Sequence, residues 1–133
     1  MISLHVQSFV DPADLAVNVR YKSSQALPRR VSDAMTNLQD DVFEAIRGNT
    51  FIDGPWEPPK VAEIYFMFCF NTRQNDVDGP LKHALDAVQN GIRKAGFPEW
   101  SDREVYGVHI EKWVGLPNIQ VAIQEADRCT RLY

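Results

Sequence analysis

The stretch that decides the fold is residues 61–102, which read VAEIYFMFCF NTRQNDVDGP LKHALDAVQN GIRKAGFPEW SD. Its first ten residues form the most apolar run in the chain, and both alternating sets of side chains in that run are largely apolar. A short run of this kind is typical of a central strand that is covered on both faces. The predicted strand is followed by a polar turn that holds two acids one residue apart, Asp76 and Asp78.

An amphipathic helix is predicted directly after the acids. We expect Asp78 to cap it, Pro80 to lie in its first turn and Gly96 to end it. Asp78, Lys82 and Asp86 are spaced i, i+4, i+8, so they share its polar face. Four apolar residues recur at helical spacing and predict the buried stripe: Leu81, Leu85, Val88 and Ile92.

The rest of the chain completes one α/β or α+β layer with a mixed sheet and two main helices. At 133 residues the sequence is expected to form one domain, residues 1–133. The other predicted elements are a strand over 2–6, a loop over 11–30, a helix from Ser32 to about Arg47, an irregular segment over 51–59, and strands over 104–113 and 119–123 joined by a turn at 115–118.

The composition is that of an ordinary globular protein, with 44% hydrophobic and 24% charged residues. No apolar run approaches the roughly 20 residues that span a bilayer, and the first residues lack the pattern of a signal peptide. We therefore expect no membrane partner and a cytoplasmic location. Cys69 lies in the apolar run and is predicted to be a buried core thiol.

The net charge of −4 is unevenly distributed. Residues 18–30 contain no acid, which leaves the remainder of the chain at −8. This segment is interpreted either as a solvated loop or as a face that binds phosphates. Its four basic residues are Arg20, Lys22, Arg29 and Arg30.

The acids suggest a metal site. Asp76 and Asp78 follow a rigid strand, and Asp102 lies beyond the helix as a possible third oxygen ligand for a hard divalent cation. Lys82 is suited to hold a phosphate by its charge. Two simpler readings stay open: Asp78 acts as a helix cap, and Lys82 with Asp86 forms an ordinary surface ion pair.

The order of these motifs resembles the RusA-type Holliday-junction resolvases. The resemblance covers about residues 61–125 and is most specific over 73–105, where an Asp-x-Asp, a lysine four residues on, an Ala-Gly-Phe helix exit and a further Asp follow in order. It implies that Asp76, Asp78 and Asp102 bind Mg²⁺, with Mn²⁺ as a substitute, that Lys82 is the essential lysine and that Arg73 belongs to a basic run. Gly79 and Ser101 depart from the family pattern, which has Asn and Asp there.

The resemblance further implies a homodimer that makes paired nicks in four-way DNA junctions during recombination or repair. The DNA-contacting residues would be Arg20, Lys22, Arg29, Arg30 and Arg73. Two alternatives stay open: a nuclease for other branched DNA, and a catalytically silent DNA-binding or assembly protein on the same scaffold.

Overall fold

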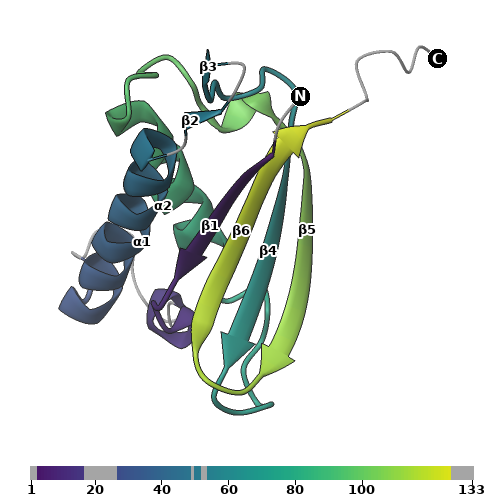
Figure 1. Ribbon diagram of the computed structural model, residues 1–133. Helices are drawn as coiled ribbons and strands as arrows, with labels where there is room; N and C mark the ends of the chain where they lie inside the picture. The colour runs from purple at the N-terminus through teal and green to yellow at the C-terminus, as the bar shows by residue number, and fades with distance from the viewer. Residues whose placement is uncertain (1–2, 17–26, 49, 52–53, 127–133) are drawn as a thin grey trace.

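The computed structural model describes residues 3–16, 27–48, 50–51 and 54–126. Four strands form a mixed sheet in the order β1-β6-β4-β5, and the helices α1 and α2 lie against one face of it (Figure 1). This arrangement confirms the predicted single mixed sheet with two main helices. The elements are β1 (Leu4–Ser8), the 3-10 helix η1 (Pro12–Leu15), α1 (Arg29–Gly48), β2 (Thr50–Phe51), β3 (Gly54–Pro55), β4 (Ala62–Phe70), α2 (Leu81–Lys94), the 3-10 helix η2 (Asp102–Glu104), β5 (Val105–Val114) and β6 (Asn118–Glu125).

The strand β4 lies in the middle of the sheet, antiparallel to β6 and parallel to β5. Parallel strands that follow one another need a crossover connection, and α2 supplies it. The crossover returns the chain along the length of the sheet. The residues that follow β4 and the residues that precede β5 therefore lie at opposite ends of the sheet (Figure 1).

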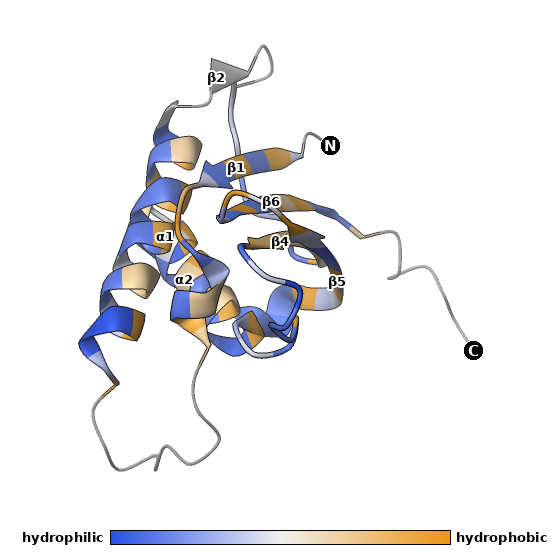
Figure 2. Cartoon of the chain, turned by 90° about the horizontal axis from the view of Figure 1, so that it is seen from below, coloured by the Kyte–Doolittle hydropathy of each residue, from blue (hydrophilic) through white to orange (hydrophobic). Residues whose placement is uncertain are grey.

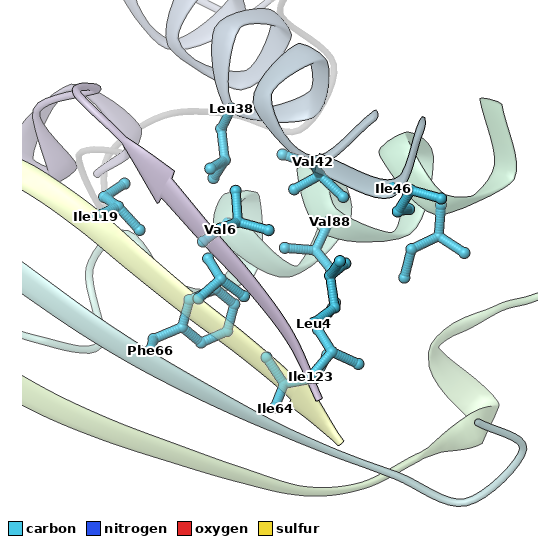
Figure 3. Close-up of a cluster of buried hydrophobic side chains, with 14 of the residues drawn as sticks. Leu4, Val6, Leu38, Val42, Ile46, Ile64, Phe66, Val88, Ile119 and Ile123 are labelled. Atoms are coloured by element: carbon cyan, nitrogen blue, oxygen red, sulfur yellow. The ribbon is translucent and has the colours of Figure 1, made fainter. Parts of the chain in front are cut away.

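The core fills the space between the sheet and the helices (Figure 3). The rings of Phe66 and Phe68 on β4 stack with centroids 5.3 Å apart. Burying one large apolar side chain contributes about 1.5–3 kcal/mol, so the alternation along β4 fixes which face turns inward. The helices turn their apolar sides to the sheet and their polar sides away from it (Figure 2). The inward set on β4 is Ala62, Ile64, Phe66, Phe68 and Phe70.

The second face of β4 differs from the expectation that both faces are covered. No described element packs against the outward side chains, since both long helices lie on the opposite face. Tyr65 is 36% exposed, and Met67 is half-buried. Only Cys69, at the end of the strand, is buried as predicted. The apolar run therefore identified a central strand correctly but overestimated its cover.

The helix α1 begins at Arg29, three residues earlier than expected, and Ser32 is not its cap. The carbonyl of Pro28 accepts hydrogen bonds from the backbone N–H groups of Val31 (3.0 Å) and Ser32 (3.1 Å), so the first turn closes on the proline. Part of the expected loop is also ordered, because Asp11 caps η1 through a bond from the Ala13 N–H to its carboxylate (3.0 Å).

The helix α2 begins at Leu81, and the prediction that Asp78 caps it with its side chain is wrong. The preceding residue, Pro80, holds the cap position and makes no side-chain bond. Backbone carbonyls close the turn instead: that of Asp78 accepts from the Leu81 N–H (3.3 Å), and that of Pro80 accepts from the Ala84 N–H (2.9 Å). The Asp78 carboxylate therefore plays no part in starting the helix.

Two smaller features complete the fold. Gly96 ends the helical segment as predicted, with a φ of 118° that favours glycine. The expected irregular segment contains a two-strand ladder in which Thr50 pairs with Pro55 and Phe51 with Gly54. Proline lacks a backbone donor, so a ladder that includes Pro55 stays short.

The helices α1 and α2 pack closely against each other at Gly91. A Cβ there would lie 2.8 Å from the Gln39 carbonyl oxygen and 2.8 Å from the Val42 Cβ. We expect Gly91→Ala to lower the free energy of unfolding by about 1–2 kcal/mol, because overpacking outweighs the gain in helix propensity. Urea denaturation measures the effect. Gly48→Ala is the matched control, since nothing lies within 4 Å of its added methyl group; an equal shift of the midpoint in both variants would contradict this account of the helix contact.

Candidate functional site

The acidic pair lies in the turn between β4 and α2, residues 71–80. Asp76 and Asp78 are both exposed, and Lys82 is exposed on the first turn of α2. Among the described residues, Lys82 forms no ion pair with Asp78 or Asp86. The surface-pair reading is thus not realised, and the two carboxylates and the ammonium all face solvent at one end of the sheet.

The turn that carries the acids is fastened to β5 by Lys112. The Lys112 Nζ donates to the carbonyl oxygens of Arg73 (2.6 Å) and Asn75 (2.5 Å), and it lies 5.9 Å from the centre of the Phe70 ring. The Thr72 hydroxyl also donates to the Asn75 side-chain oxygen (3.0 Å). These contacts fix the backbone of the residues directly before Asp76.

The other end of the turn packs against η1. A Cβ on Gly79 would lie 3.3 Å from the Ala16 Cβ and 3.5 Å from the Asp76 carbonyl oxygen. A side chain there would require Ala16 to move by a few tenths of an ångström. Glycine therefore suits the close approach of Ala16, the residue that ends η1.

Asp102 is not brought to the acidic pair. It begins η2 at the start of β5, where its backbone N–H donates to the Gln89 side-chain oxygen (2.8 Å). Gln89, which binds Asp102, lies eight residues beyond Leu81, or about 12 Å along the helix. Asp76 and Asp78 precede Leu81, so this length of helix lies between them and Asp102. Within the described ranges, no group of three or more His, Cys, Asp or Glu side chains is placed to hold a metal ion.

The second departure, Ser101, has a local structural role. Its hydroxyl accepts from the Arg103 N–H (3.4 Å), and the Glu104 carboxylate accepts from the Ser101 N–H (3.1 Å). This reciprocal pair is a capping box that starts η2. Serine is a preferred residue at that position, so the sequence fits the cap.

The basic residues of the expected loop divide into two kinds. Arg20 and Lys22 lie outside the described residues. Arg29 lies on the first turn of α1 with a side chain that is 94% exposed, and among the described residues its one ion pair is with Asp33 at 3.6 Å. Arg73 is exposed in the acidic turn. Both guanidinium groups are therefore accessible from solvent.

Arg30 is engaged within the fold. Its guanidinium donates to the carbonyl oxygens of Ala13 (3.3 Å) and Ala16 (3.4 Å) and lies 3.8 Å from a carboxylate oxygen of Asp14. It therefore ties α1 to η1, which makes it a poorer candidate for binding DNA than Arg29.

Two features were missed in the sequence. One is Lys112, whose signal is a lysine in the same alternating set as Val108 and Ile110, which pack against the core. The other is a polar network on the face of the sheet opposite the helices, which we call the open face.

The open face carries stacked rings of Tyr65 and His109, with centroids 4.4 Å apart. The Tyr65 hydroxyl donates to Glu63 (3.1 Å), and the His109 Nε2 lies 4.0 Å from the same carboxylate. A hollow of about 580 Å³ on this face is lined by these rings together with Gln7, Met67 and Ala122. No periodicity in one strand reveals such a network, because its members come together through strand pairing.

Comparison with known proteins gives no relative: no family model and no curated sequence matches the chain. In the part of the chain that the structure describes, no helix has the length and apolar character needed to cross a membrane.

Proposed function

We propose that this chain is a Mg²⁺-dependent endonuclease of the RusA type that nicks branched DNA, with four-way junctions as its substrate. The observation that carries the proposal is the geometry of the turn after β4. A central strand delivers two exposed carboxylates to the start of α2, a lysine follows one turn later, and the backbone of the turn is held to β5. The order of motifs that resembles the family supports the same reading.

The donor set at this turn fits Mg²⁺. This ion keeps several waters and is commonly held by one or two protein carboxylates together with substrate phosphate oxygens. Asp76 and Asp78 would be those ligands, with Mn²⁺ as a substitute. When bound, such an ion lowers the pKa of a coordinated water and polarises the phosphate. Lys82 would stabilise the negative charge that develops on the phosphate oxygens, and its exposed side chain leaves room for DNA.

A homodimer is part of the proposal, because two matched nicks in a four-way junction suit an enzyme with two-fold symmetry. A dimer also offers a route for Asp102 to take part as a metal ligand. Asp102 lies at the far end of the sheet from the acidic pair of its own chain. We therefore propose that Asp102 acts in the site of the second copy.

DNA contacts are proposed for Arg29 and Arg73, which are exposed, and for Arg20 and Lys22 on the basis of charge. Phosphate contacts position a protein on DNA without reading its sequence. A fold with a net charge of −4 has little general attraction for DNA, so the few exposed cations would decide where the junction lies.

A second candidate is a catalytically silent DNA-binding or assembly protein on the same scaffold. The observation that favours it is the separation of Asp102 from the acidic pair. A cleavage assay on labelled four-way junction, fork, flap and duplex DNA, with Mg²⁺ and with chelator, distinguishes the candidates. Preference for another branched substrate would assign the same site to a related nuclease.

Substitutions in the turn test the catalytic roles. We expect Asp76→Asn and Asp78→Asn to abolish junction cleavage without loss of folding, since each removes a ligand charge from an exposed position. Lys82→Ala should lower turnover by on the order of 10²-fold, as for loss of one partner of the transition-state charge. Single-turnover cleavage at saturating enzyme measures both effects. Lys94→Ala is the control, because Lys94 lies at the opposite end of α2 and pairs with Asp40 at 3.4 Å; a rate equal to that of the control would remove Lys82 from the mechanism.

Mixed dimers test whether Asp102 acts across the interface. We expect Asp76→Asn and Asp102→Asn each to be inactive alone. An equal mixture, unfolded and refolded together, should recover nicking at about a quarter of the wild-type rate, because half the dimers are mixed and each holds one intact site. A nicked-circle or single-strand readout is needed, since one site gives no paired cut. If the mixture stays inactive, Asp102 does not act in trans; if Asp102→Asn is fully active alone, it is no ligand.

Salt dependence tests the DNA-binding role of Arg29. We expect Arg29→Ala to make the log–log dependence of junction affinity on salt shallower by about 0.9, the value for one lost phosphate contact. Fluorescence anisotropy in chelator measures binding without cleavage. Arg47→Ala, at the opposite end of α1, is the matched control and should keep the wild-type slope. The same slope in both variants would place the DNA-binding face away from the start of α1.

A further inference from the structure

Lys112 lies in the alternating set of β5 that also holds Val108 and Ile110, which pack against the core, but its own side chain is exposed. In the register of the β4–β5 pair, Lys112 lies opposite Phe68, and Ile110, two residues earlier on the same side of β5, lies opposite Phe66. Both phenylalanines are buried. A lysine in this alternating set leaves the sheet on the face that the helices cover. Its ammonium can therefore reach the turn that follows β4, and it does not extend over the opposite face of the sheet.

Among the described residues, the Lys112 ammonium contacts neutral partners: two backbone carbonyls and an aromatic ring. Two of its three protons point at the carbonyl oxygens of Arg73 and Asn75, and the group lies against the Phe70 ring. Charged donors make shorter and stronger bonds than neutral ones. Two such bonds to carbonyls two residues apart hold the backbone at both positions.

Because Lys112 binds the turn directly before Asp76, its contacts affect how the acids are held. The turn runs for ten residues, 71–80, with no helix or strand. Asn75 immediately precedes Asp76, so the carbonyl bound by Lys112 belongs to the same peptide unit as the Asp76 nitrogen. At the far end, Gly79 packs closely against Ala16. The backbone from Asp76 to Asp78 is thus held on both sides, and both of its carboxylates are exposed.

We propose that Lys112 is a positioning residue: its ammonium clamps the turn after β4 so that Asp76 and Asp78 are held ready for one divalent cation. The role in cation binding rests on the proposed function, whereas the clamp itself does not. Two effects of the charge oppose each other, because an ammonium near the site also repels a cation. The clamp dominates, since ordering two ligands before binding removes a cost that the cation would otherwise have to overcome.

The clamp is tested first by limited proteolysis with trypsin, which cuts after Arg73, at the carbonyl that Lys112 binds. We expect Lys112→Met to be cleaved there at least about 10-fold faster than wild type at equal enzyme, because a bond held in a fixed turn must open before cleavage. Mass spectrometry of the fragment ending at Arg73 gives the rate. Lys112→Arg keeps donors and charge and should stay protected; Lys94→Met is the control for loss of a lysine elsewhere.

Cation binding is tested in parallel with Mn²⁺ alone, by electron paramagnetic resonance of the free ion. Asp76→Asn should lower the affinity for Mn²⁺ relative to wild type. Lys112→Met should bind Mn²⁺ about 10-fold more weakly than wild type, whereas the affinity of Lys112→Arg should stay close to that of wild type. Circular dichroism confirms that each variant is folded. If Lys112→Met does not fold, Lys112→Gln, which keeps an amide NH₂ donor without the charge, replaces it in both assays with the same expected direction.

The outcomes separate the inference from the proposed function. Unchanged cleavage at Arg73 in the folded Lys112 variant overturns the clamp. Faster cleavage with undiminished Mn²⁺ affinity overturns its role in presenting the acids. If wild-type Mn²⁺ binding is absent or insensitive to Asp76→Asn, the proposed metal site fails, and faster cleavage in Lys112→Met would still support the clamp.

Discussion

The parallel pairing of β4 with β5 is the constraint on which the site depends. It demands a crossover, α2 supplies that crossover, and the two ends of α2 consequently lie at opposite ends of the sheet. The acidic pair follows β4 and Asp102 precedes β5, so the same pairing that buries Phe66 and Phe68 also keeps the third carboxylate away from the other two. No adjustment of side-chain rotamers spans a distance set by the helix length.

Most of the fold could be predicted because its signals are local. The stripe from Leu81 to Ile92 and the alternation over Ala62 to Phe70 each report their own element, and both elements formed. Leu81 and Leu85 are only partly buried, however, and the second face of β4 lacks the expected cover. The errors arose where two groups compete for one role. Asp78 has the chemistry of a cap, but backbone carbonyls close the turn first. Likewise, Pro28 starts α1 before Ser32 can.

The candidate site could be predicted only in part, because spacing along a chain says little about distance in space. Asp76 and Asp78 lie in the same turn because only one residue separates them. The approach of Asp102 to either was assumed from motif order, and the crossover does not provide it. Conversely, Lys112 is far from Asp76 in sequence but reaches the adjoining carbonyl through strand register. A lysine in the same alternating set as Val108 and Ile110 was the available sign of that contact.

The turn after β4 shows how a fold can expose acids without losing the order of the backbone beneath them. A carboxylate used as a helix cap is committed to its own N–H groups and is less available to a ligand. Here the backbone demand at the start of α2 is met by carbonyls, and the carbonyls of the turn are met by Lys112. The side chains of Asp76 and Asp78 are thereby left to solvent on a fixed support. Such a division, in which backbone carbonyls and the Lys112 ammonium hold the turn while the two carboxylates stay exposed, suits the Mg²⁺ site that we propose.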